Sequence, residues 1–262
     1  MISDGMADVL RSLRQDGSGR PAQACARALG AGGIALSLLV GDDRTAEPLW
    51  CHPELSTRFE ELQFTLGEGP GPDAVRTGSP VVEPDLDRVR PERWPTLLPA
   101  ARDMGVQGVG GFPLGIGAIR VGVLTVLYDG DLRVSEQQYA DAIALAAALT
   151  GMFLNGDHGG GRSGDAPGVG VFLEWPSGLH RAAVHQATGM ISVQLGVSMQ
   201  EALLRLRAYA YGSESPLGEV AQNVVARRLR FNDDINNNFD DNFDENSDDD
   251  VSGPNSPDGG KG

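Results

Sequence analysis

Apolar residues recur with two different periods in the first 155 residues of the chain. Residues 7–13 and 22–29 have helical apolar spacing, and the sequence Ser135-Glu136-Gln137-Gln138 is a capping box that opens an Ala-rich helix to about Leu154. The apolar runs at 34–40 and 119–128 predict strands, the second buried mainly on one face, and residues 80–83 predict a short edge strand. This order predicts an α+β fold with a largely antiparallel sheet flanked by helices.

From residue 175 to residue 231 the pattern predicts three short helices, each with one apolar stripe. The stripes are Val184, Ala187, Ile191 and Leu195, then Ala202, Leu203, Leu206 and Ala210, then Leu217, Val220, Ala221 and Val224. We expect Gly196 to end the first helix in a left-handed conformation and Ser198, in a second capping box, to begin the second. Ser215 is expected to cap the third, which we extend from Leu217 to Leu229. These features predict an all-α three-helix bundle.

Composition changes sharply at two places and suggests where the domains end. Residues 156–170 are rich in glycine without apolar periodicity, and after Phe231 the chain becomes an Asn/Asp run. We therefore expect an α+β domain over 1–155, a linker over 156–174, the helical domain over 175–231 and a disordered acidic tail over 232–262.

Charge is unevenly distributed in a chain whose net charge is −15. The tail carries −9 and residues 1–179 carry −9, whereas residues 180–231 carry six arginines against three glutamates, a net of +3. Local charge, rather than net charge, decides where a phosphate group can bind. The helical segment is therefore the candidate nucleic-acid-binding region of an otherwise acidic protein.

Other classes of function find little support in the sequence. No apolar run reaches the length of a membrane span, no export signal is visible, and the two cysteines suit a reducing cytoplasm. The four histidines are scattered and no hydrolase or metal motif occurs, so we expect no catalysis, metal or cofactor. The glycine-rich stretch 66–72 lacks the Gly-Lys-Ser/Thr ending of a phosphate loop, and Glu68 would repel an anion, which favours a structural turn.

The helical segment resembles the ANTAR module of transcription antitermination regulators, from about Leu179 to Leu229. The matching positions are Gln186 to Met190, Leu195 to Ser198, Glu201-Ala202, Leu206-Arg207, Ala210, Leu217 and Val220-Ala221. Lysine is common in the family at the position of Thr188, so one basic side chain is missing here.

Most of residues 5–155 resemble the GAF domains that accompany ANTAR modules in bacterial two-domain regulators. The motifs are Glu61 to Pro72, Asp85-Leu86, Trp94-Pro95 and Phe112-Pro113-Leu114, with Gly71 in a segment where relatives often have cysteine. The two resemblances imply a cytoplasmic homodimer that captures RNA hairpins near terminators. They also imply that the GAF domain senses a signal, with a small-molecule ligand as one candidate that the sequence does not identify.

The candidate RNA-binding residues combine the arginines with positions taken from the resemblance. They are Arg181, Gln186, Arg205, Arg207, Tyr209, Arg227 and Arg228. Guanidinium groups clamp phosphates and stack on unpaired bases, and tyrosine can stack as well. The alternatives are that the arginines only solvate helix faces and that Tyr209 packs at the edge of the bundle. We interpret Gly189 as a point of close helix approach, and Ala187 and Ala202 as small core residues.

Two other functions stay open, as does the purpose of the tail. A DNA-binding factor also uses a three-helix bundle, and a bundle can serve only for protein contacts and dimerisation. The anionic tail either solvates the protein or folds back on the basic segment and competes with RNA.

Overall fold

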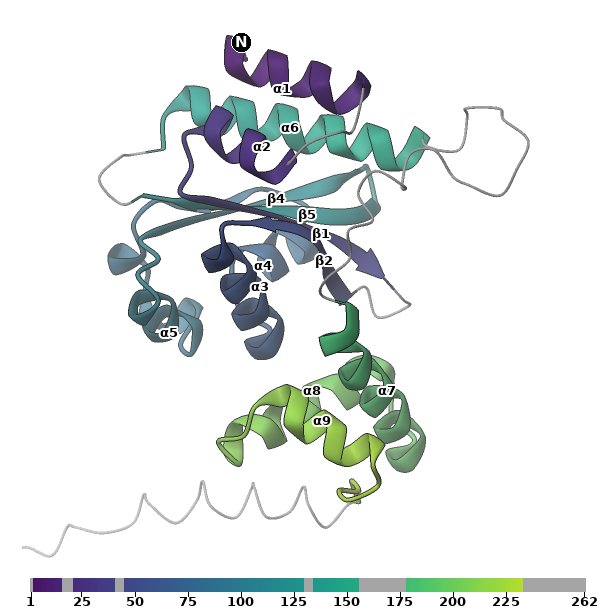
Figure 1. Cartoon of the computed structure of the whole chain (residues 1–262). Helices are drawn as coiled ribbons and strands as arrows, with labels where there is room; N and C mark the ends of the chain where they lie inside the picture. The colour runs from purple at the N-terminus through teal and green to yellow at the C-terminus, as the bar shows by residue number, and fades with distance from the viewer. Residues whose placement is uncertain (1, 16–20, 41–44, 130–133, 156–177, 233–262) are drawn as a thin grey trace, which may run out of the picture. The chain divides into compact units, whose positions relative to one another are not determined.

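The computed structural model describes residues 2–15, 21–40, 45–129, 134–155 and 178–232 (Figure 1). Its Cα atoms cluster into two compact units, Met1–Ala182 and Ala183–Gly262. The expected linker and all of the expected tail beyond residue 232 lie outside the described residues. Within the described ranges, no helix is both long and apolar enough to cross a bilayer.

The first unit is built on one five-stranded antiparallel sheet with the strand order β2-β1-β5-β4-β3. The strands are β1 (Gly33–Val40), β2 (Thr45–His52), β3 (Val81–Glu83), β4 (Gly108–Ile116) and β5 (Ile119–Tyr128). This confirms the predicted antiparallel sheet, and β3 lies at an edge as expected.

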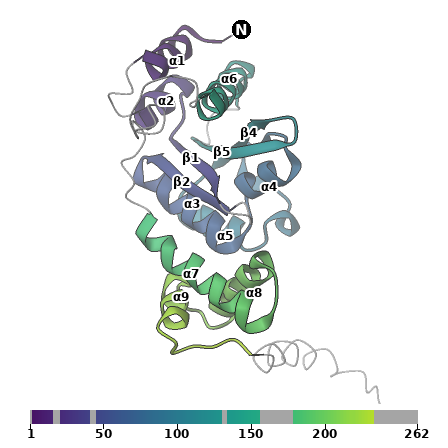
Figure 2. The same cartoon turned by 90° about the vertical axis from the view of Figure 1, so that its right-hand side faces the viewer.

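Helices cover both faces of this sheet (Figures 1 and 2). One face carries α2 (Pro21–Leu29) and α6 (Glu136–Asn155), with α1 (Asp4–Gln15) packed on these two helices. The other face carries α3 (Glu54–Leu66), α4 (Pro70–Thr77) and α5 (Leu97–Asp103). Single 3-10 turns at Leu86–Arg88 and Pro91–Arg93 lie between β3 and α5. Two apolar clusters result, one on each side of the sheet.

The expectation that the strand 119–128 is buried mainly on one face is wrong. Leu124 and Val126 pack in the cluster under α1, α2 and α6, whereas Val123 and Leu127 pack in the cluster under α3, α4 and α5. Alternating side chains point to opposite faces of a strand, so β5 needs apolar residues at consecutive positions because helices cover both faces.

The glycine-rich stretch 66–72 contains the tight turn, at residues 67–69, that joins α3 to α4, so the predicted structural turn is confirmed. Gly67 ends α3 in the left-handed region at φ 69°. The Glu68 carboxylate accepts hydrogen bonds from the backbone N–H groups of Thr96 and Leu97, at 3.1 and 2.9 Å. The N–H of Gly71 donates to the Gln63 amide oxygen at 2.8 Å. Glu68 therefore serves the start of α5, and this turn is a structural element.

The second unit contains the helices α8 (Met199–Gly212) and α9 (Leu217–Val225) and most of α7 (Gly178–Leu195), whose first turn belongs to the first unit. The three predicted stripes form its core, with Leu195 only half-buried. Gly196 ends α7 at φ 65°, and the Ser198 hydroxyl accepts a hydrogen bond from the Glu201 N–H at 3.2 Å. The three-helix bundle and these two boundaries are thus confirmed.

Two predictions about the third helix are wrong. The helix ends at Val225 rather than Leu229, because the N–H groups of Arg227 and Arg228 turn back to the carbonyls of Val224 and Asn223. Ser215 does not cap it: its hydroxyl donates to the Ser213 carbonyl. The arginines after Val225 are therefore carried on a turn and not on a helix face.

Candidate nucleic-acid interface

Helix α7 has two different faces in the second unit. Val184, Ala187 and Ile191 point into the bundle and are buried. About a third of a turn away around the helix, Gln186 and Val193 occupy positions i and i+7 of another stripe, and both are exposed. The side chain of Val193 is 85% exposed, the largest value among the described large apolar residues. Burial of the bundle core does not account for this second stripe.

The turn after α9 is packed back onto the bundle. Phe231 is buried, its ring meets the Tyr209 ring edge-on at 5.5 Å between centroids, and its N–H donates to the Gln194 amide oxygen at 3.0 Å. Within the turn, Arg227 has a left-handed backbone at φ 58°, which disfavours a side chain by about 1–2 kcal/mol. Residues 226–230 thus lie between the end of α9 and the packed Phe231, and these two anchors hold Arg227 in its left-handed conformation.

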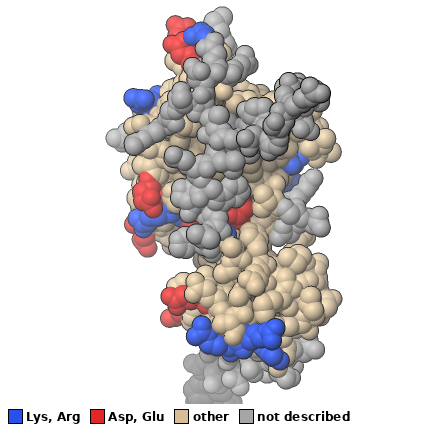
Figure 3. Space-filling model, turned by 45° about the vertical axis from the view of Figure 1, so that its right-hand side comes forward, with Lys and Arg blue, Asp and Glu red and all other residues tan. Residues whose placement is uncertain are grey.

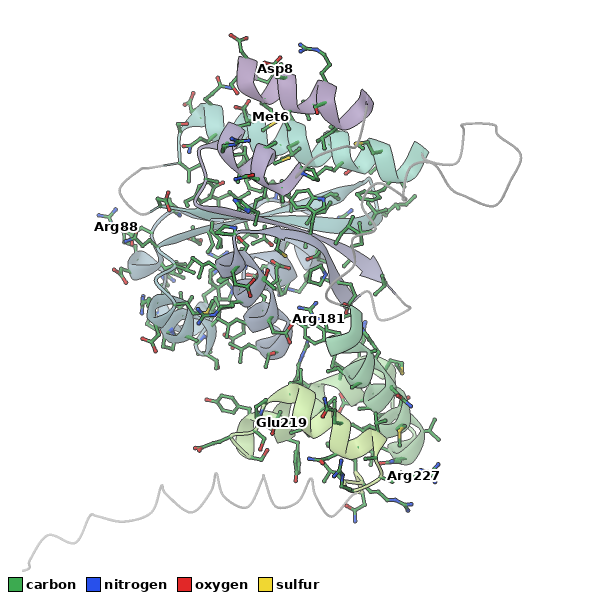
Figure 4. All side chains as sticks on the ribbon, viewed as in Figure 1. Met6, Asp8, Arg88, Arg181, Glu219 and Arg227 are labelled. Atoms are coloured by element: carbon green, nitrogen blue, oxygen red, sulfur yellow. The ribbon has the colours of Figure 1, made fainter. Side chains whose placement is uncertain are left out.

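The exposed stripe of α7 and this turn together form a groove of about 480 Å³. Its lining residues are Gln186, Gly189, Met190, Val193, Gln194, Arg227 and Arg230. Apolar side chains thus line part of the groove, and two arginines line another part. Figure 3 shows basic side chains gathered along one edge of this unit, and Figure 4 shows Arg227 just beyond the end of α9.

The charges of the turn are not neutralised by ion pairs within the described part of the chain. Among those residues, Arg227, Arg228 and Arg230 have no carboxylate within 4.0 Å, and all three are exposed. Such groups are available to bind phosphate oxygens, which they can clamp in a bidentate manner. The accessible positive charge of the second unit therefore lies at the groove.

Arg181 is placed elsewhere, in the first unit. Its side chain is 3% exposed and forms an ion pair with Glu61 at 3.0 Å. It also donates to the carbonyls of Ala46 and Glu60 and lies over the Phe64 ring at 4.0 Å. Figure 4 shows it in the first turn of α7. The guanidinium is engaged by acceptors of the first unit, so the structure gives Arg181 no place on the groove.

The remaining predicted residues are divided by the structure. Gln186, Arg227 and Arg228 lie at or beside the groove. Arg205 forms an i,i+4 ion pair with Glu201 at 2.9 Å on α8, and Arg207 is half-buried on the same helix. Tyr209 packs on Phe231, which is the alternative that the sequence left open. The RNA-binding roles themselves stay predictions.

Five of the residues that line the groove are not among the candidate RNA-binding residues predicted from the sequence. For one of the five, Gly189, the sequence predicted a different role. Arg230 belongs to the basic segment and Met190 to the motif that resembles the ANTAR family, but neither is among the candidate residues. Val193 and Gln194 carry no signal beyond their spacing along α7. The expectation that Gly189 marks close helix approach is wrong: beyond its own helical turn, a Cβ built there meets no atom of the described residues within 4 Å. Glycine in a helix interior costs about 1 kcal/mol relative to alanine, and packing within the described residues does not explain that cost.

The first unit offers a different kind of surface. A hollow of about 730 Å³ is lined by residues of β3 and the 3-10 turns, where Arg93 pairs with Glu83 and Asp73. Burial raises the pKa values of Cys25 and Cys51 to about 12, with the charge of Glu60 adding to the effect at Cys51. Both thiols therefore stay protonated near neutral pH. Among the described residues, no three His, Cys, Asp or Glu side chains are grouped to hold a metal ion.

Comparison with known proteins decides what the helical unit is. Residues 179–225 match the ANTAR domain family. The chain contains an ANTAR domain. ANTAR domains are RNA-binding antitermination regulators and GAF domains are sensory domains, so the groove lies on a domain of an RNA-binding family. The search of curated proteins found no match.

Solved GAF domains are similar to the chain over its N-terminal region. That of an Acinetobacter phosphoenolpyruvate-protein phosphotransferase has 13% identity and a TM-score of 0.45, covering 61% of this chain and 96% of that one. The Coxiella burnetii counterpart has 17% identity and a TM-score of 0.42, covering 58% and 96%. A GAF domain/HD domain protein from Geobacter sulfurreducens has 16% identity and a TM-score of 0.39, covering 60% and 99%. These values carry no conclusion about a ligand or an activity.

The ANTAR part of the expected two-domain architecture is confirmed. In the first unit, the five-stranded antiparallel sheet with helices on both faces agrees with the fold that the sequence predicted.

Proposed function

We propose that this protein is a cytoplasmic, signal-responsive regulator whose ANTAR domain captures hairpin RNA and thereby prevents transcription termination. The single observation that carries the proposal is the group of three exposed arginines, without ion pairs among the described residues, beside a groove of the ANTAR domain. A captured hairpin excludes the overlapping terminator hairpin, so polymerase continues. The signal is sensed by the GAF-like unit, and two copies of the chain act together on paired hairpins.

The arrangement favours RNA loops over duplex DNA. A helical DNA reader presents its base-contacting side chains along a recognition helix in the major groove. Here α9 ends at Val225, and Arg227, Arg228 and Arg230 follow on a turn. Sequence-specific RNA recognition uses splayed bases in loops together with phosphate contacts, and a short basic turn beside a partly apolar groove suits such a target.

The test measures binding of a fluorescent RNA hairpin to the full chain by anisotropy, with unlabelled duplex DNA as competitor. Replacing Arg227, Arg228 and Arg230 together by Gln should weaken binding at least about 100-fold, because each charge-assisted hydrogen bond contributes about 1.5–3 kcal/mol. The slope of log affinity against log salt should become shallower by about 0.7 for each single-stranded phosphate that the variant no longer binds. Arg207→Ala, the position favoured by the family resemblance, should weaken binding by about 1–3 kcal/mol.

The matched control replaces Arg11, Arg76 and Arg88, which are exposed on the first unit, by Gln in the same background. This changes the net charge equally and should leave hairpin affinity within about twofold. Equal losses of hairpin affinity in both triple variants would mean that binding depends on the net charge of the protein and not on the arginines of the turn. Stronger competition by duplex DNA than by unlabelled hairpin would favour the DNA-binding alternative.

A further inference from the structure

Gly189 and Gly218 are both helical glycines of the ANTAR domain. Beyond their own helical turns, added Cβ atoms at these positions would meet no atom of the described residues within 4 Å. Neither is required by packing, and neither has a positive φ. Alanine is the better helix former at such a position. The difference between them is that Gly189 lines the groove and Gly218, on α9, does not. The open space above Gly189 is therefore groove space.

The groove combines three kinds of chemistry around that space. Met190 and Val193 offer apolar contact, and Val193 is 85% exposed. Gln186 and Gln194 contribute amide groups, each of which both donates and accepts hydrogen bonds. Arg227 and Arg230 contribute planar cations. A phosphate alone uses only the cations, and a purely apolar partner leaves them without a counter-charge.

From this combination we infer that the groove holds one unpaired nucleobase of the bound RNA, and that residue 189 is glycine because the base occupies the space of its missing side chain. The inference rests on the proposed RNA-binding function. The flat base packs against Met190 and Val193 over the bare backbone of Gly189, its edge meets the glutamine amides, and the adjoining phosphates meet Arg227 and Arg230. The base is unpaired, because a base inside a stem is stacked and its faces are covered.

The occupant is RNA and not a second copy of this chain, because of charge. A symmetric contact through the groove would bring the same exposed arginines of two copies together, with no carboxylate among the lining residues to neutralise them. A polyanion that carries flat aromatic groups supplies both the counter-charge and the surface for the apolar wall.

The experiment uses the full chain with Gly189→Ala, and Gly218→Ala as the matched control. Each protein is titrated with two synthetic hairpins that share one stem: one has an intact loop, and the other has the same loop with its nucleobases replaced by abasic sites. Thermal unfolding of each protein is followed in parallel by circular dichroism.

We expect the wild type and Gly218→Ala to prefer the intact loop by at least about 10-fold, the scale of one stacked base. Gly189→Ala should lose at least about 10-fold in affinity for the intact loop, bind the abasic loop as the wild type does, and have a Tm at least equal to that of the wild type. The defect is then confined to recognition of the base.

Three results would overturn the inference while leaving the proposed function intact. The first is unchanged affinity of Gly189→Ala for the intact loop. The second is an equal loss of affinity for the intact and abasic loops, which would indicate contact with the RNA backbone. The third is a lowered Tm of Gly189→Ala, which would show that the glycine is structural. Failure of the wild type to bind either hairpin would instead reject RNA binding and the base site together.

Discussion

The paired arginines of the first unit and the arginines of the turn after α9 in the second unit are used in opposite ways. In the first unit, Arg76, Arg93 and Arg102 each pair with a nearby carboxylate, and the guanidinium of Arg181 is buried among acceptors. In the second unit, the arginines of the turn after α9 have no such partner among the described residues. A paired arginine contributes to its own fold, whereas an exposed and unneutralised one is available for an external anion.

Glycine shows the same contrast. Side chains at Gly108 and Gly111 would clash with the carbonyl oxygens of Pro84 and Pro70, so these glycines permit close approach of backbone to the sheet. Gly189 borders open space. Gly108 and Gly111 thus serve packing, whereas Gly189 leaves room at a surface, and only the atoms around each position distinguish the two roles.

The largest expected effect tests the contrast between arginines. Arg181→Ala should lower the free energy of unfolding by about 3 kcal/mol, because it leaves buried acceptors without their donor and Glu61 without its partner. Arg228→Ala, at an exposed position, should change it by less than about 0.5 kcal/mol. Urea denaturation measures both. Similar losses would mean that the two arginines are equally structural.

The contrast between glycines predicts that replacement by alanine changes the free energy of unfolding with opposite signs at Gly111 and Gly218. Gly111→Ala should destabilise the protein by about 1–3 kcal/mol, since the new Cβ overpacks against the Pro70 backbone. Gly218→Ala should instead stabilise it by up to about 1 kcal/mol through helix propensity. The midpoints of thermal unfolding should move in opposite directions, and a shared direction would contradict the comparison.

A pair of serines sharpens the description of the second unit. Ser198→Ala should lower stability by about 1 kcal/mol, because the hydroxyl accepts the Glu201 N–H at the start of α8. Ser215→Ala should change stability by less than about 0.5 kcal/mol, because that hydroxyl donates to the Ser213 carbonyl and does not cap the helix. Denaturation midpoints of the two variants provide the measurement. A larger effect at Ser215 would restore it as the cap of α9.

The smallest expected effect concerns the acidic tail. Removing residues 232–262 takes away a charge of −9 and should raise hairpin affinity by about fivefold or less at low salt, with the difference vanishing as salt screens it. Anisotropy titrations at two salt concentrations measure this. Unchanged affinity at low salt would leave the tail as a solvating extension.

Local sequence signals sufficed where a boundary depends on neighbouring residues. The Ser135 and Ser198 caps, the left-handed end at Gly196 and the stripes of α7, α8 and α9 follow from hydrogen bonds and periodicity within a few residues, and the structure confirms them. The end of α9 could not be predicted in this way. Residues 226–231 have no helix-breaking residue, and the helix stops because Phe231 packs against Tyr209 and bonds to Gln194 from another helix.

The sequence by itself determined the two-part organisation, the antiparallel sheet, the three-helix ANTAR domain and the concentration of positive charge in it, because these depend on local periodicity, composition and motif. Only the tertiary structure decided which positive charges are accessible. It buries Arg181, pairs Arg205 with Glu201, and brings Arg227 and Arg230 beside a bare glycine on α7. Accessibility and enclosure depend on residues far apart in the chain, and spacing along one segment carries no information about them.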